Sequence, residues 1–166
     1  IVTGASRASG IGAAVCLSLA EAGADIFFTH WCAFDGNEGN GIEREFPERL
    51  ADDIRNLGVR CEHMEMDLSQ ADSGVLLLNE VEKPIGTPAI LVNNATYESP
   101  SNFRTLDGDI LYRHYKVNNF GTFLLSTEFA KRYEKAFNRQ KGGRIIHLVS
   151  GGPDPNNLAY IATKGA

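Results

Sequence analysis

Short apolar runs alternate along the chain with longer segments in which apolar residues recur at helical spacing. The apolar runs predict strands at residues 1–3, 24–29, 59–66, 89–92 and 144–149. The segments between them predict helices at residues 11–22, 47–56, 69–81 and 107–137, and another from residue 158 onward. Such alternation is typical of βαβ units, so the sequence predicts an α/β fold built around a parallel sheet.

The segment after the second predicted strand, residues 30–41, is polar and rich in glycine, and we expect a loop there. No internal repeat, low-complexity tract or linker divides the chain, so residues 1–166 are expected to form a single domain. The first strand and the last helix both look incomplete in the sequence. We therefore expect this domain to be truncated at both ends.

The composition is that of an ordinary globular protein, with 43% hydrophobic and 22% charged residues among 166. A net charge of -5 gives no electrostatic reason to expect nucleic acid or an anionic membrane as a partner. The 3 cysteines are widely spaced and odd in number, which favours a reducing cytoplasm over a disulfide framework. None of the 4 histidines pairs with another histidine or a cysteine at ligand spacing, so no metal site is predicted.

A glycine-containing turn lies between the first strand and the first helix, with the sequence TGASRASGIG from residue 3 to residue 12. Glycines at such a turn allow the backbone to approach a pyrophosphate, which then lies against the positive end of the helix. The turn residues predicted to contact a cofactor are Gly4, Ser6, Arg7, Gly10, Ile11 and Gly12. The alternative is a glycine-rich loop that binds no ligand, because short glycine motifs are common.

Tyr160 and Lys164 are placed at i and i+4 in a predicted helix, which puts a phenol and an ammonium on one face. A nearby cation lowers the pKa of a tyrosine from about 10, so the phenol can exchange a proton with a carbonyl oxygen. Ser150 ends the preceding strand, at the edge where open α/β sheets bind ligands. Tyr112 and Lys116 have the same spacing but no strand and serine before them, so we interpret that pair as structural.

Taken in chain order, these motifs resemble those of the short-chain dehydrogenase/reductase family, and the chain looks most similar to its 3-oxoacyl-acyl-carrier-protein reductases. The glycine turn resembles the family motif TGxxxGxG with two extra residues. Asp67 and Leu68 match the acidic position at the adenine side. Asn94 and Ala95 match the NNAG motif, with Thr96 in place of its glycine. The resemblance implies a Rossmann-type, doubly wound parallel sheet in a three-layer sandwich, forming one dinucleotide-binding and catalytic domain.

The resemblance also implies a catalytic tetrad. Asn118 matches the helix asparagine of a water-linked proton relay, and Ser150 matches the serine that bonds to the substrate oxygen. Tyr160 and Lys164 match the proton-exchanging pair, and both would also contact the cofactor. Ser150 and Tyr160 are closer in sequence than is usual in the family. Either the loop between them is unusually short, in which case Ser150 does not reach the substrate, or residues are absent from the sequence.

The choice of cofactor is made near the end of the second strand, where a carboxylate would hold the ribose 2′-hydroxyl of NADH and repel a 2′-phosphate. This chain has His30 there, and its first acid, Asp35, comes several residues later. Arg7 resembles the basic residue of family members that prefer NADPH. We therefore expect NADP(H), with Arg7 and His30 near the 2′-phosphate and NAD(H) as the alternative.

The activity implied is reduction of a carbonyl to an alcohol, or the reverse, with hydride transfer from the cofactor and Tyr160 as general acid/base. A 3-oxoacyl thioester is the first expected substrate, followed by a sugar or another small ketone. The alternative of another class is a non-catalytic NADP-binding regulator on the same fold. Relatives assemble through the helices after the fourth and fifth strands, so a cytoplasmic homodimer or homotetramer is expected, with neither nucleic acid nor a membrane as a partner.

Overall fold

The computed structural model describes residues 1–37, 41–137 and 142–165. Its strands are β1 (Ile26–His30), β2 (Cys61–Glu65), β3 (Ile90–Asn93) and β4 (Arg144–His147). Its α-helices are α1 (Ile11–Glu21), α2 (Cys32–Asn37), α3 (Phe46–Asn56), α4 (Ser73–Ile85), α5 (Gly108–Tyr115), α6 (Thr122–Phe137) and α7 (Leu158–Lys164). A π-helix, η1 (Lys116–Gly121), joins α5 to α6. Among the described residues, no helix combines the length and the apolar content that crossing a membrane requires.

The strands form one parallel arrangement with the N-terminal segment at its centre. β1 pairs with β2 and β3 pairs with β4, both in parallel. Val2 joins the two pairs, because it forms parallel bridges to Phe28 of β1 and to Val92 of β3. The order is therefore β2, β1, the Val2 segment, β3, β4. Successive strands are added toward β2 on one side of Val2 and toward β4 on the other. Open sheets bind ligands at such a switch point, beyond the carboxyl ends of the strands.

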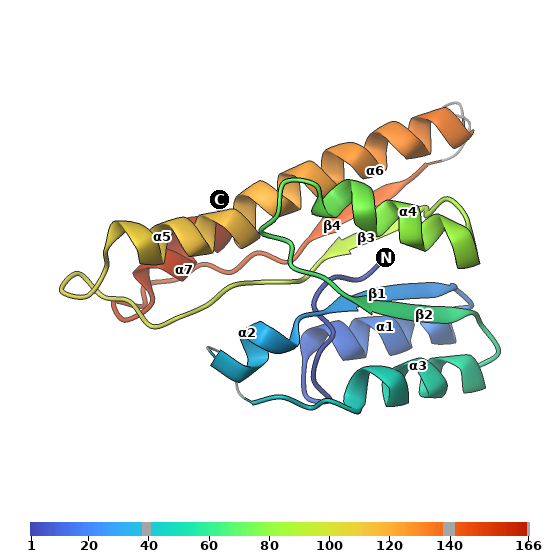
Figure 1. Ribbon diagram of the computed structural model, residues 1–166, viewed down its shortest axis with the longest axis horizontal. Helices are drawn as coiled ribbons and strands as arrows, with labels where there is room; N and C mark the ends of the chain where they lie inside the picture. The colour runs from blue at the N-terminus through green and yellow to red at the C-terminus, as the bar shows by residue number, and fades with distance from the viewer. Residues whose placement is uncertain (38–40, 138–141, 166) are drawn as a thin grey trace.

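Helices cover both faces of this sheet, as Figure 1 shows, with α1 and α3 on one side and α4 and α6 on the other. The sequence of β1 explains the arrangement, since successive strand residues point to opposite faces. Phe28 packs in one core cluster with Leu50 and Ile54 of α3. Phe27 packs in the other with Leu77 of α4 and Phe129 of α6. The α/β fold with a doubly wound parallel sheet between two helix layers, predicted from the sequence, is confirmed.

Three elements differ from the sequence prediction. The glycine-rich stretch 30–41 is not a simple loop, because it contains the short helix α2; residues 38–40 lie outside the described part. The helix predicted over 107–137 is divided by the π-helix η1. The helix predicted from residue 69 begins at Ser73, because residues 67–70 form a hydrogen-bonded turn.

Candidate cofactor pocket and catalytic residues

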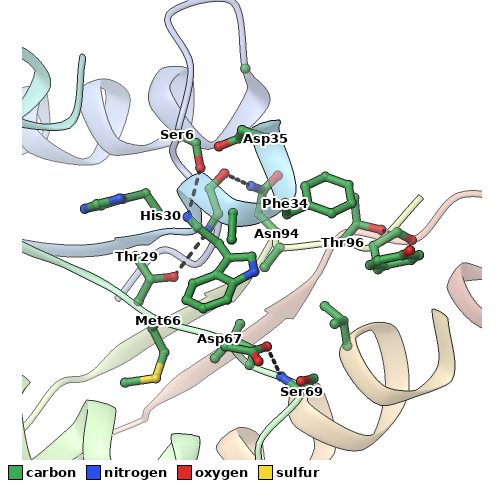
Figure 2. Close-up of a pocket in the computed structure, with 18 of the residues that line it drawn as sticks. Ser6, Thr29, His30, Phe34, Asp35, Met66, Asp67, Ser69, Asn94 and Thr96 are labelled. Atoms are coloured by element: carbon green, nitrogen blue, oxygen red, sulfur yellow. Dashed lines mark hydrogen bonds between the residues drawn. The ribbon is translucent and has the colours of Figure 1, made fainter. Parts of the chain in front are cut away.

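A cavity of about 630 Å³ opens at the carboxyl ends of β1 and β3 (Figure 2). Its walls come from the glycine turn before α1, from α2, and from the segments that follow β2 and β3. Most of the residues predicted to bind a cofactor line it: Gly4, Ser6, Arg7, Gly10, Ile11, His30, Asp67, Leu68, Asn94 and Ala95. Gly12, Tyr160 and Lys164 were predicted with them but are not among the lining residues. The fold therefore gathers the predicted cofactor residues from four separate segments into one pocket.

The glycine turn is packed too closely for other residues. Gly4 has φ +75°, and a Cβ there would lie 2.7 Å from the Cα of Ala95. A Cβ on Gly12 would lie 2.6 Å from the carbonyl oxygen of Gly4. Gly12 thus packs against the backbone of the turn and does not line the pocket. Gly10 precedes α1 and makes no side-chain cap, so the first N–H groups of α1 are left for a ligand.

Asn94 fixes the shape of this turn from the end of the neighbouring strand β3. Its Nδ2 donates hydrogen bonds to the carbonyl oxygens of Thr3, at 2.9 Å, and Gly4, at 2.8 Å. The backbone N–H groups of Asn94 and Ala95 both donate to the Thr3 hydroxyl. Asn94 and Ala95 were predicted as cofactor contacts. The structure shows that they also hold the glycine turn against the loop after β3.

His30 lines the pocket, but both of its ring nitrogens have partners. Nε2 lies 3.2 Å from Nδ1 of His63, and Nδ1 lies 3.8 Å from the sulfur of Cys32. Burial lowers the pKa of His30, and the neighbouring His63 lowers it further. An imidazole whose two ring nitrogens both have partners is poorly placed to bind a phosphate. The geometry thus gives no support to the predicted contact between His30 and the 2′-phosphate.

Asp35 lies in the same pocket as Arg7, although it comes several residues after the end of β1. Helix α2 turns the chain back and buries the Asp35 side chain to 6% exposure. Burial raises the pKa of this carboxyl, while the Ser6 hydroxyl and the Arg7 guanidinium lower it. Sequence reasoning missed this position because it expected no helix there. Arg7 and Asp35 together give the pocket one positive and one negative group at this end.

Asp67 follows β2 and stabilises the turn before α4. Its carboxylate accepts hydrogen bonds from the backbone N–H of Ser69, at 2.9 Å, and from the Gln70 side chain, at 2.8 Å. Burial raises the pKa of Asp67, but these hydrogen bonds outweigh it, so the pKa lies below the usual value. Leu68 is buried beside it, and both residues face the cavity.

Asn118 lies in the π-helix and connects two parts of the candidate catalytic site. Its Oδ1 accepts from the backbone N–H of Tyr97 at 2.8 Å. Its Nδ2 donates to the Thr163 hydroxyl at 2.9 Å. Tyr97 lines the pocket, and Thr163 immediately precedes Lys164. Asn118 therefore ties α7 to the wall of the cavity.

Lys164 is buried at the end of α7 and reaches the pocket wall. Its Nζ donates to the carbonyl oxygen of Ala95 at 3.2 Å. Burial lowers the pKa of the ammonium to about 8. Tyr160 is half-buried one turn earlier on the same helix. The lysine of the predicted Tyr–Lys pair thus contacts a residue that lines the cavity.

Ser150 lies beside α7 but is joined to it through the backbone. Its N–H donates to the carbonyl oxygen of Lys164 at 3.0 Å. Among the described side-chain hydrogen bonds, none connects the Ser150 hydroxyl with Tyr160. The structure brings Asn118, Tyr160 and Lys164 together around α7, and it leaves the predicted role of Ser150 without a supporting contact.

The second Tyr–Lys pair, interpreted as structural from the sequence, also lines the cavity. The Nζ of Lys116 lies 5.6 Å from the centre of the Tyr112 ring. Tyr112 is 59% exposed, which is not typical of a core residue. The π-helix begins at Lys116, and a sequence pattern of helical period does not reveal such a turn. These residues form the rim of the pocket opposite the glycine turn.

One group of potential metal ligands lies next to the pocket. The spacing of histidines and cysteines predicted no metal site, but the fold brings His30, Cys32 and Glu65 together with ligand atoms within 4.8 Å of one another. Glu65 comes from β2, whereas His30 and Cys32 come from the end of β1 and the start of α2. A pairing between strands cannot be read from spacing in the sequence.

The sequence pattern of the family described as short chain dehydrogenase matches residues 1–166. The chain is 42% identical over 169 residues to the uncharacterized oxidoreductase YjdA of Bacillus subtilis, covering 100% of this chain and 63% of that protein. It superposes on the acetoin dehydrogenase YohF of Salmonella typhimurium with a TM-score of 0.77 and 30% identity, covering 99% of this chain and 60% of that one.

A second solved structure is a blue fluorescent protein from a metagenomic library in complex with NADPH. Its TM-score is 0.80 at 26% identity, with 99% of this chain and 62% of that chain covered. The chain thus spans about three fifths of the length of these relatives.

Proposed function

Because this chain belongs to the short-chain dehydrogenase family, we propose that the complete protein is an NADPH-dependent oxidoreductase that converts a carbonyl to an alcohol, or the reverse. The observation that carries this proposal is the position of the Tyr160–Lys164 pair. Lys164 contacts Ala95, which lines a cavity whose other wall is the glycine turn. A proton-exchanging pair next to a dinucleotide-sized pocket is the arrangement that such a reaction requires.

The residues present fit a dinucleotide. The first turn of α1 offers N–H groups that no side chain caps, and Gly4 and Gly12 leave no room for a Cβ beside them. A pyrophosphate would lie at this positive helix end, with Asp67 and Leu68 toward the adenine and Ala95 toward the nicotinamide. When bound, the cofactor supplies the hydride. The protein positions it and handles the proton.

The preference for NADPH rests on Arg7. A guanidinium forms strong, charge-assisted hydrogen bonds with a phosphate, and Arg7 stands in the pocket on the side of α2. One structural relative is named for its complex with NADPH. Asp35 lies in the same part of the pocket and is the carboxylate that would hold the 2′-hydroxyl of NADH. We therefore propose NADP(H) as the preferred cofactor and NAD(H) as a weaker one.

In the proposed reaction Tyr160 gives its phenolic proton to the carbonyl oxygen as the hydride arrives at the carbon. The buried ammonium of Lys164, one helical turn away, favours the phenolate that remains. Asn118 keeps Lys164 in position through its hydrogen bond to Thr163. In this proposal the hydroxyl of Ser150 would hold the substrate oxygen.

For the substrate we propose a small ketone or its α-hydroxy derivative, because one structural relative is named an acetoin dehydrogenase. A 3-oxoacyl thioester is the second proposed substrate, because the motifs resemble those of 3-oxoacyl-acyl-carrier-protein reductases. A sugar is the third. A non-catalytic NADP-binding regulator would keep the pocket but would not turn over any of these.

We also propose that the complete protein is a homo-oligomer. The surface of α5 and α6 exposes large apolar side chains, which monomeric proteins seldom gather on one stretch of helix. They are Leu111, Tyr112, Tyr115, Phe123 and Leu124.

The test is to measure oxidation of NADPH and NADH by the full-length protein with diacetyl, simple ketones, sugars and a short 3-oxoacyl thioester. Tyr160→Phe should bind NADPH normally and lose turnover by a factor of about 10³ or more, since the proton donor is gone. Tyr115→Phe is the matched control, because Tyr115 is exposed and lies outside the pocket.

Turnover that survives in Tyr160→Phe but is lost in Tyr112→Phe would move the catalytic role to the second pair. Binding of NADPH without turnover of any carbonyl would support the regulator.

A separate variant tests the preference for NADPH over NADH. Arg7→Ala should raise the KM for NADPH about tenfold or more and leave the KM for NADH nearly unchanged, because only NADPH carries the 2′-phosphate. Arg49→Ala, an exposed arginine on α3, is the control. An equal effect of Arg7→Ala on both cofactors would contradict the assignment.

A further inference from the structure

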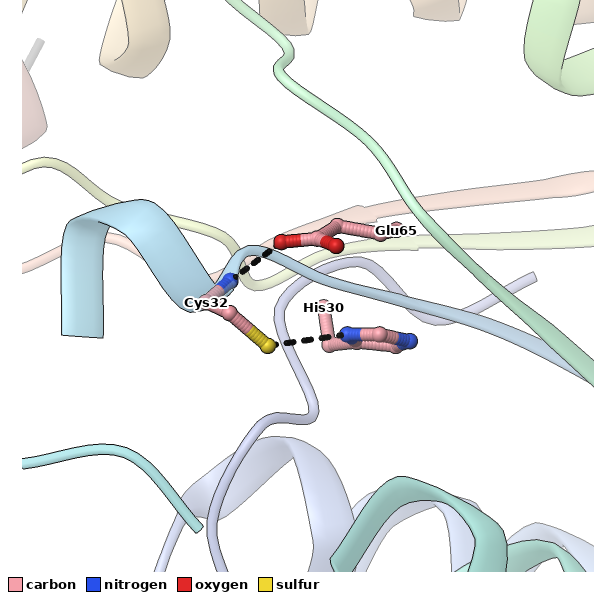
Figure 3. A group of neighbouring side chains, drawn as sticks. All are labelled: His30, Cys32 and Glu65. Atoms are coloured by element: carbon pink, nitrogen blue, oxygen red, sulfur yellow. Dashed lines mark hydrogen bonds between the residues drawn. The ribbon is translucent and has the colours of Figure 1, made fainter. Parts of the chain in front are cut away.

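Three side chains of different chemistry converge where β1, β2 and α2 meet (Figure 3). The sulfur of Cys32 lies 3.8 Å from Nδ1 of His30. Glu65 accepts a hydrogen bond at 2.9 Å from the backbone N–H of Cys32, which holds its carboxylate above the start of α2. The proposed oxidoreductase reaction uses none of these three ligand atoms.

A hydrogen-bond chain fixes which nitrogen of His30 faces this group. The Glu48 carboxylate accepts from Nε2 of His63 at 3.0 Å. In the tautomer of His63 that donates through Nε2, Nδ1 carries the lone pair and accepts from Nε2 of His30 at 3.2 Å. The proton of His30 is thereby held on Nε2, and Nδ1 presents its lone pair to Cys32 and Glu65. Histidines that bind metals are oriented in this way, with the second nitrogen donating to a fixed partner.

The sulfur–nitrogen pair has a separation close to that of a tetrahedral ion, and the Glu65 oxygen lies within 4.8 Å of both atoms. With a Zn–S bond of about 2.3 Å and a Zn–N bond of about 2.0 Å, the sulfur and nitrogen of a tetrahedral site lie about 3.5 Å apart. The observed separation between Sγ of Cys32 and Nδ1 of His30 is 3.8 Å. One thiolate, one imidazole and one carboxylate form a donor set that favours zinc over magnesium or calcium.

We propose that His30, Cys32 and Glu65 bind a divalent transition-metal ion, with Zn²⁺ as the best fit and water in the fourth position. On binding, a metal–sulfur bond forms and the thiol proton leaves to solvent. Glu48 and His63 support the site without touching the ion. The ion would join the ends of β1 and β2 to the first residue of α2.

A metal ion bound here would also affect helix α2 and the neighbouring cavity. Phe34 and Asp35 of α2 line the neighbouring cavity. Helix α2 has only 6 residues, so it has little stability of its own. A metal anchored at Cys32 would fix the first turn of this helix and thereby one wall of the cavity.

The experiment uses full-length protein freed of metal with a chelator. Zn²⁺ is titrated by calorimetry, and Co²⁺ is added as a spectroscopic probe. We expect one ion per chain and, with Co²⁺, a thiolate-to-metal charge-transfer absorption together with the visible bands of tetrahedral coordination. Cys32→Ser and Glu65→Gln should each weaken Zn²⁺ binding at least 100-fold, and Cys32→Ser should abolish the charge-transfer band. His63→Ala should weaken binding about 10- to 100-fold while the band remains, because it removes only the support of His30.

Glu62→Gln is the matched control, since Glu62 is an exposed carboxylate on the same strand, and its Zn²⁺ affinity should equal that of the unchanged protein. Zn²⁺ affinity that is the same in Cys32→Ser and the unchanged protein would overturn the proposal, as would a Co²⁺ complex without a thiolate band. The band is read in the unchanged protein, so a variant that fails to fold does not decide the outcome. The result is independent of the proposed carbonyl reduction, because no turnover is measured.

Discussion

The charged side chain of Lys164 is largely shielded from solvent. Its side chain is buried, and among the described contacts its one hydrogen bond goes to the carbonyl oxygen of Ala95. Burial without a counter-ion lowers the pKa of the ammonium from 10.5 to about 8. The folded protein therefore bears a desolvation cost at neutral pH, of the kind found where function requires an unfavourable charge.

We expect Lys164→Met to be more stable than the unchanged protein at pH 7 by up to about 3 kcal/mol, since the lowered pKa measures that cost. Between pH 8 and pH 10.5 the folded state releases the proton while the unfolded state keeps it, so the unchanged protein gains stability as the pH rises. The difference between the two should shrink over this range. Urea denaturation of the full-length proteins at pH 7 and pH 10 measures it, with Lys131→Met, on exposed α6 surface, as the control. A difference that stays constant would show that burial of the charge is not the cause.

Individual site residues were predictable only where the chemistry lies within one short segment. The glycine turn is contiguous, so Gly4, Gly10 and Gly12 could be identified from sequence. The partners of His30 could not be read from sequence, because His63 comes from the neighbouring strand. Asp35 was placed too far away, since the helix that returns it to the pocket has no clear sequence signal.

At the scale of elements, the π-helix between α5 and α6 is the main departure from the predicted regular helix. Such turns are rare and often occur at functional sites. Here the turn contains Asn118 and ends at Gly121, which packs against the backbone of Leu68. The apolar pattern of residues 107–137 is continuous, so it predicted one long helix. A pattern of helical period does not distinguish a π-turn from the α-helix around it.

Gly121→Ala should destabilise the protein by about 2 kcal/mol, because a Cβ at this position would clash with the carbonyl oxygen of Leu68. The backbone of Leu68 cannot move without disturbing the pocket that it lines, so NADPH affinity should fall as well. Gly108→Ala, in the first turn of α5 with open space around it, should have little effect. Thermal unfolding and NADPH titration measure both effects. Equal stability of the two variants would mean that α6 can shift to make room.

At the scale of the whole molecule, the sequence predicted a doubly wound parallel sheet, because strands alternate with helices along the chain. The order of the strands, with the Val2 segment between β1 and β3, comes from the pairing that the structure shows. The surfaces of the assembled molecule were less predictable. The proposed oligomer depends on which apolar residues of α5 and α6 remain uncovered, and only the folded chain shows this.

Phe123 is 65% exposed on α6 and is the most direct test of that surface. Phe123→Glu should convert the oligomer of the full-length protein into a smaller species, because a charge cannot be buried unpaired in an interface. Light scattering coupled to size-exclusion chromatography measures the mass. Val75→Glu, at an exposed apolar position on α4, should leave the mass unchanged. An unchanged mass for Phe123→Glu would place the interface elsewhere.

The hydrogen bonds from Asn94 and Ala95 to Thr3 also determine when the proposed cofactor site can first form during synthesis. A ribosome completes the turn at Thr3 and Gly4 long before it adds Asn94. Until Asn94 has left the exit tunnel, the turn lacks the donors that set its shape. A nascent chain that ends in α4 therefore contains a complete first βαβ unit but no competent phosphate site, so cofactor in the cell cannot stabilise it at that stage.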